Sequence, residues 1–165
     1  MKTKTISIYN IHELSEKAQE KAHSDYLYLN NSFEYFWIDE SIESVKAFCD
    51  LFSVRLTGWE LSTYGRSGFS TDATQESFRG IKPKYIKNEW PTGYALDDIL
   101  VNAFHNNLGP QGNIKGAFFA ALDAGLSNIV RDMEYQESFE YFLEMAEANE
   151  WEYLEDGSSA WRCAA

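Results

Sequence analysis

Carboxylates are the side chains of this sequence with the clearest chemical potential, and they gather near its C-terminal end. Residues 132–156 hold ten Asp and Glu side chains and neither Lys nor Arg. A run of one charge sign can coordinate a metal ion, contact a basic protein or simply keep the chain dissolved. The sequence leaves these three explanations open, and the arrangement of the acids bears on the choice among them.

The spacing of residues in this stretch predicts a helix from Gln136 to Asn149. Apolar side chains recur at the interval that lines one helix face: Phe139, Phe142, Leu143 and Ala146. A row of acids runs beside that face: Glu137, Glu140, Glu144 and Glu147. Its like-charge neighbours together cost about 1 kcal/mol, because no base stands one turn away to relieve them. The helix therefore buries aromatics and displays a single-sign surface.

We predict that this surface binds a basic surface of another protein. Carboxylates would supply charge and two exposed aromatics would anchor the contact. The predicted set is Glu137, Glu140, Glu144, Glu147, Glu150, Glu152, Glu155, Asp156, Trp151 and Tyr153. Duplex DNA presents about one charge per 1.7 Å of axis, whereas the helix presents roughly one per 5 Å. Mimicry of nucleic acid would therefore need further acids on the same side of the molecule as this helix. These are the four acids at 150–156 and Asp39, Glu40 and Glu43.

Alternative chemistries find weaker support in the sequence. The three histidines, His12, His23 and His105, form no zinc-binding spacing, and no nucleophile motif is present. Asp39 and Glu43 stand one helical turn apart and could together hold Mg²⁺. A metal-dependent enzyme acting on a nucleotide or phosphodiester is thus the first alternative, and a homo-oligomeric structural protein is the second. We predict no catalytic residue, metal ligand or cofactor.

Composition limits the classes of partner. The net charge is −12, and residues 89–165 carry 14 acids against three bases. That half is unsuited to binding nucleic acid or an anionic membrane directly. At 165 residues and 44% hydrophobic content the chain fits a single domain, 1–165. The N-terminus lacks a signal-peptide core and no run is long enough to span a membrane, so a cytosolic location is expected.

The pattern along the chain predicts an α+β fold. Strands are expected at Thr3–Tyr9, at Val54–Leu61 with a bulge near Gly58, and in a C-terminal β-hairpin around Asp156 and Gly157, with arms at 150–154 and 159–163. A loop at 62–80 contains a weaker candidate strand, 69–73. A first helix is expected in the segment that follows His12, with Ser15 as N-cap and a break at 30–32, and further helices are expected at 33–51, 96–108, 114–131 and 136–149. We therefore predict a small antiparallel or mixed sheet of three to five strands, covered by about five helices.

Three stretches carry a resemblance to known proteins: 13–22, the aromatic and acidic 36–41, and 147–157. On these the chain resembles a family of small uncharacterised phage and prophage proteins. The resemblance implies an accessory protein of a bacterial virus, expressed in the cytoplasm of the host bacterium. Acidic phage proteins of this size include inhibitors of restriction and CRISPR nucleases, some of them DNA mimics. By analogy of class, the expected partner is a host nuclease or other defence factor.

Overall fold

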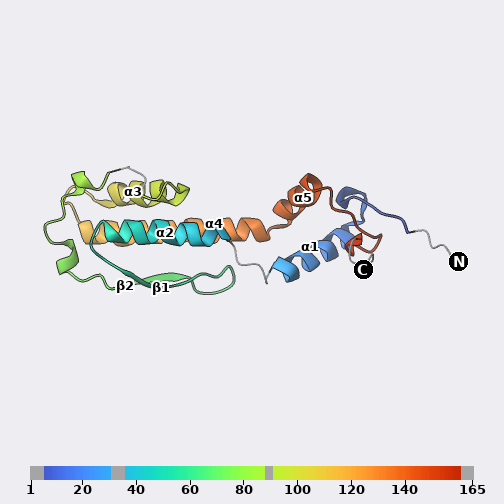
Figure 1. Ribbon diagram of the computed structural model, residues 1–165, viewed down its shortest axis with the longest axis horizontal. Coiled ribbons are helices and arrows are strands. Elements are labelled where there is room, and N and C mark those ends of the chain that lie inside the picture. The colour runs from blue at the N-terminus through green and yellow to red at the C-terminus, as the bar shows by residue number, and fades with distance from the viewer. Residues whose placement is uncertain (1–5, 31–35, 88–90, 161–165) are drawn as a thin grey trace. The chain divides into compact units, whose positions relative to one another are not determined.

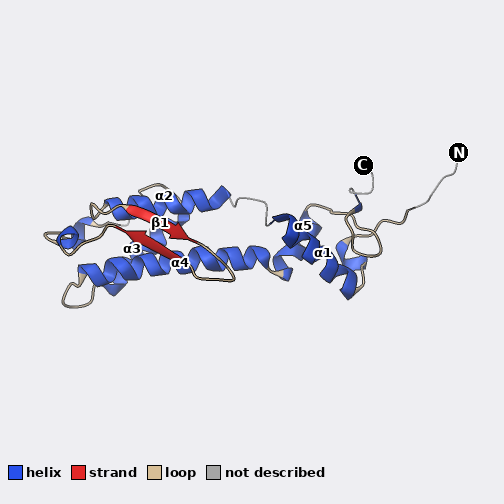
Figure 2. Ribbon diagram, turned by 90° about the horizontal axis from the view of Figure 1, so that it is seen from below, coloured by secondary structure: helices blue, strands red, loops and turns tan. Residues whose placement is uncertain are grey.

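The computed structural model describes residues 6–30, 36–87 and 91–160 and is mostly helical (Figures 1 and 2). The α-helices of this part of the chain are α1 (Glu16–Asn30), α2 (Phe36–Asp50), α3 (Ala95–Asn107), α4 (Ile114–Glu137) and α5 (Phe139–Ala148). Short 3₁₀ helices occur at Ile11–Glu13, Glu76–Phe78 and Pro83–Tyr85. The strands are β1 (Leu56–Glu60) and β2 (Gly68–Thr71). The five predicted helices are thereby confirmed, although residues 33–35 of the second lie outside the described part, and α4 continues six residues beyond its predicted end.

The predicted α+β class with three to five strands is wrong. Helices make up 59% of the structure, and its sheet is the antiparallel pair β1–β2. The strand expected at 54–61 is confirmed as β1, with its pairing register shifting between Leu56 and Gly58, where the bulge was predicted. The weaker candidate strand is β2. Of the expected first strand, residues 3–5 lie outside the described part, and Tyr9 forms a single bridge, to Tyr153.

The predicted C-terminal β-hairpin is also wrong, although its turn is present. The Leu154 amide donates to the Ser158 carbonyl at 2.8 Å, and the Gly157 amide to the Leu154 carbonyl at 2.9 Å. Beyond this turn the arms meet at one bridge, Tyr153 with Ser159. The first arm is short because residues 149–151 close the end of α5 instead of extending. The second arm beyond residue 160 lies outside the described residues.

The chain divides into two compact units. Residues 35–133 form one of them, which we call the middle unit, and residues 1–34 with 134–165 form the other, which we call the terminal unit. Each has its own cluster of buried apolar side chains. The length-based expectation of a single domain remains a prediction.

Phenylalanines fill the core of the middle unit. Phe48 of α2 stacks on Phe118 of α4 with ring centroids 5.7 Å apart, and Phe104 of α3 meets Phe48 edge-on at 6.3 Å. Helix α3 lies on one side of the α2–α4 pair, and the β1–β2 hairpin lies on the other (Figures 1 and 2). Cys49 is fully buried in this core, and burial raises the pKa of its thiol to about 12. It is therefore a structural residue.

A buried polar network joins α2 to the start of α3. The carboxylate of Asp97, 2% exposed, accepts the amides of Thr92 and Gly93 at 2.9 and 3.0 Å and the Thr92 hydroxyl at 3.0 Å. That hydroxyl has one proton and gives it to Asp97. The fully buried Ser44 hydroxyl, 3.1 Å from Thr92 Oγ1, must therefore be the donor in that second contact. Asp97 therefore holds the backbone before α3 and, through Thr92, links α3 to α2.

Candidate functional site

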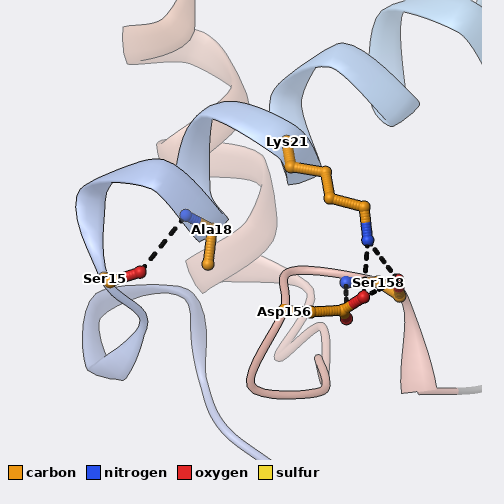
Figure 3. Close-up of polar contacts among 5 residues, drawn as sticks. All are labelled: Ser15, Ala18, Lys21, Asp156 and Ser158. Atoms are coloured by element: carbon orange, nitrogen blue, oxygen red, sulfur yellow. Dashed lines mark hydrogen bonds and ion pairs between the residues drawn. The ribbon is translucent and has the colours of Figure 1, made fainter.

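The predicted partner-binding residues belong to the terminal unit, whose core forms between α1 and α5. Leu14, Ala18 and Ala22 come from the first part of the chain, and Phe142 and Ala146 come from α5. The Ser15 hydroxyl accepts the Ala18 amide at 3.4 Å, so the predicted N-cap of α1 is confirmed (Figure 3). With its small side chains, this face of α1 allows α5 to approach closely.

Helix α5 is shorter than predicted, and this divides the predicted acidic row. Ser138 caps the helix by accepting the Tyr141 amide at 3.1 Å, so α4 ends at Glu137. Glu137 therefore belongs to α4, and the row on α5 consists of three exposed acids: Glu140, Glu144 and Glu147. Phe142 and Ala146 are buried as the periodicity predicted, whereas Phe139 is 36% exposed.

The end of α5 turns the chain through an unusual residue. The Glu150 amide donates to the Glu147 carbonyl at 3.0 Å and the Trp151 amide to the Ala146 carbonyl at 2.9 Å, the two bonds of a Schellman motif. Glu150 occupies the left-handed position of that motif, with φ 50°, where glycine is usual. Helix α2 ends in the same way, with Ser53 at φ 53°. Each motif therefore carries a local strain that glycine would relieve.

Tyr153 is buried, so its expected role as an exposed anchor is wrong. Its side chain is 5% exposed, and burial raises the pKa of its phenol to about 12. Its backbone exchanges two hydrogen bonds of 2.9 Å with Tyr9, which brings residues 8–13 beside α5. Trp151 is half-buried and packs against Tyr26 with ring centroids 5.9 Å apart. Of the two predicted aromatic anchors, Trp151 is therefore the accessible one.

This pairing of Tyr9 with Tyr153 creates a groove of about 600 Å³ that the sequence did not predict. One wall is formed by residues 8–13, and the other by Ala146, Glu147 and residues 150–152. Ile8 and Trp151 give it apolar surface, and Glu13 stands with the three predicted acids of the other wall. The two walls are more than 130 residues apart in sequence, and no local pattern signals that they meet.

The acids around the groove differ in how far they are neutralised. Glu147 lies 3.4 Å from the ring Nε2 of His12, with both side chains more than half exposed. Glu13 accepts the Asn10 amide at 2.9 Å in a capping box. Glu150 and Glu152 are exposed and make no ion pair within the described part of the chain. These two carboxylates are therefore the most available to an incoming cation.

Two further acids have partners outside the groove. Glu144 accepts the Tyr135 hydroxyl at 3.0 Å, and this bond raises the pKa of the phenol. Asp156 accepts the Lys21 ammonium at 2.8 Å and both the amide and the hydroxyl of Ser158 (Figure 3). These contacts, the Lys21 bond first, lower the pKa of Asp156 to about 2. Asp156 therefore joins the turn to α1 as a structural contact. Glu155 is exposed beside it.

We expect Lys21→Met to raise the pKa of Asp156 back toward its ordinary value, because the mutation removes the largest cause of the shift. A carboxylate whose pKa is lower in the folded state stabilises the fold above the unfolded pKa and loses that contribution as pH falls through the folded value. Acid unfolding should therefore begin at a higher pH in the variant. Carboxyl chemical shifts measured by NMR against pH give the pKa, and Lys17→Met on the same helix serves as control. An unshifted Asp156 titration in Lys21→Met would contradict the assignment.

No group of three or more His, Cys, Asp and Glu side chains able to hold an ion occurs within residues 6–30, 36–87 and 91–160. Of the pair considered for Mg²⁺, the Glu43 carboxylate pairs with the Lys46 ammonium at 2.6 Å. The alternative of a metal-dependent enzyme therefore gains no site from the described residues and stays a prediction.

Comparisons of the chain with protein families, with curated proteins and with solved structures find no match. Among the described helices, none is both long enough and apolar enough to cross a membrane.

Proposed function

We propose that this chain is a non-enzymatic binding protein whose acidic C-terminal surface occupies a basic surface of another protein. The observation that carries the proposal is the exposure of Glu140, Glu144 and Glu147 on α5 and of Glu150 and Glu152 beyond its end, in a stretch without Lys or Arg. Complementary charge of this kind speeds association and selects the partner.

The proposed partner is a nucleic-acid-binding protein of a bacterial host, such as a nuclease or other defence factor, met in the host cytoplasm. A basic patch is the electrostatic footprint of that class of protein, and the resemblance to phage proteins supports the setting. The charge spacing supports a particular mode of inhibition. Glu140, Glu144 and Glu147 span about 10 Å of helix, far more thinly than the charges of a duplex. The surface therefore covers a basic patch instead of copying DNA along its length.

We expect reversal of two acids on α5, Glu140→Lys with Glu144→Lys, to abolish capture of the partner. The wild-type chain, immobilised and exposed to bacterial lysate, should retain basic nucleic-acid-binding proteins. Added duplex DNA should compete for the same basic surface and release them. Retention should weaken with salt, because exposed charges are screened. Mass spectrometry identifies what is retained by each form of the chain.

The matched control is Glu16→Lys with Glu20→Lys on α1. Like Glu140 and Glu144, these two acids are exposed and one helical turn apart, and the first of each pair lies in the first turn of a helix of the terminal unit. Retention by the control and loss by the α5 variant is the expected result. Equal loss in both would reduce the interaction to net charge, and equal retention would remove α5 from it. Retention of a second copy of the chain itself would favour the homo-oligomeric alternative.

A further inference from the structure

The groove differs chemically from the row of exposed acids on α5, which we call the outer acidic row: Glu140, Glu144 and Glu147, of which Glu147 also lines the groove. Four of the described residues that line it are glutamates, its histidine, His12, pairs with Glu147, and no Lys or Arg is among the described lining residues. Apolar surface from Ile8 and Trp151 lies among these acids. Low-dielectric walls around charges of one sign focus the field and concentrate counter-charged groups. A volume of about 600 Å³ is ample for a short peptide segment with one long side chain inserted.

We infer that this groove binds an arginine-bearing segment of the protein partner, with the guanidinium group held between Trp151 and the carboxylates of Glu150 and Glu152. The inference rests on the proposed function and assigns its specificity to one place. Arginine suits the groove better than lysine because its planar group stacks on an aromatic ring and gives paired hydrogen bonds to carboxylates. Lysine offers a compact, strongly hydrated charge that gains little from the tryptophan.

The conformation of Glu150 makes the inference testable, because one substitution should raise stability and lower affinity for the peptide. Because Glu150 stands in the left-handed position of the Schellman motif, Glu150→Gly should raise the Tm of the protein. The same substitution removes a carboxylate from the groove, so it should weaken binding of the arginine segment about threefold. A residue with a purely structural role would not show a more stable protein with weaker binding.

Ser53→Gly is the matched control. Ser53 holds the equivalent left-handed position after α2 in the middle unit, with a closely similar φ. It should raise the Tm while leaving peptide affinity unchanged. Trp151→Leu, which keeps an apolar side chain beside Tyr26, should remove the preference for arginine over lysine.

The experiment uses the full chain and two capped nonapeptides, each of three Gly-Arg-Gly or three Gly-Lys-Gly repeats. Calorimetry should give several-fold tighter binding of the arginine peptide, and the indole N–H resonance of Trp151 should shift in ¹H–¹⁵N spectra. Equal affinity for the arginine and lysine peptides would overturn the inference. So would a result in which Glu140→Lys with Glu144→Lys weakens binding of the arginine peptide as much as Glu150→Gly does.

The two proposals can fail separately. If the α5 reversal abolishes capture of the lysate partner while Glu150→Gly and Trp151→Leu leave it intact, the binding function stands and the groove assignment falls. If the peptides bind in the groove as expected but capture from lysate ignores the α5 reversal, the proposed function of the outer acidic row falls.

Discussion

Gly157→Ala should destabilise the terminal unit by about 3 kcal/mol or more. Gly157 is buried in the turn after Tyr153, with φ +83°, a conformation that costs an alanine about 1 kcal/mol. An alanine Cβ would also lie 2.0 Å from the backbone carbonyl oxygen of Ala18 in α1. A helix carbonyl cannot swing aside as a flexible side chain does, so the turn and α1 must separate.

Urea unfolding followed by circular dichroism measures this loss. Gly80→Ala is the control, because Gly80 has a similar φ of +76° and nothing within 4 Å of the added Cβ. It should cost only the conformational part, about 1 kcal/mol. Equal small losses in the two variants would show that the turn does not rest on α1.

Asp97→Ala should cost about 3 kcal/mol, the second-largest effect expected. The substitution leaves the amides of Thr92 and Gly93 and the Thr92 hydroxyl without their acceptor in a buried site. The buried Ser44 hydroxyl then loses a partner whose orientation Asp97 had fixed. The expected result is early unfolding of the middle unit in urea.

Asp98→Ala separates this network from the helix dipole. Asp98 also lies in the first turn of α3, so its loss removes the same favourable charge, but it takes no part in the bonds to Thr92 and Gly93. We expect a loss of about 0.5 kcal/mol. If Asp97→Ala proves no worse than Asp98→Ala, the carboxylate contributes only as a helix cap.

The helices were predictable because their signals are local. A cap such as Ser15 and a repeat such as Phe142 and Ala146 act within a few residues, and the structure places them as expected. The predicted C-terminal β-hairpin was wrong because the decisive local signal was missing from the sequence. Alternation at 150–154 is compatible with a strand, but Glu150 takes a left-handed conformation that ends α5, and glycine, the usual marker of that conformation, is absent there.

The candidate site was predictable in its charges and not in its shape. Exposure of Glu140 and Glu147 follows from their place beside the apolar face of α5, away from the core. Burial of Tyr153 and the groove itself depend on contact with Tyr9, which lies at the other end of the chain. A sequence read along its length carries no sign of that pairing, since both segments are only short and weakly alternating.

The division of the terminal unit between the two ends of the chain sets an order of events during synthesis. Residues 35–133 are contiguous, so every contact within the middle unit is available once that stretch has left the ribosome. The apolar face of α1 emerges earlier but must wait for α5 and the turn at Gly157, which are translated after the middle unit. Domains generally fold as units during translation. The nascent chain therefore carries the apolar face of α1 without its α5 partner until α5 and the turn at Gly157 have been translated, and the acidic groove exists only after that point.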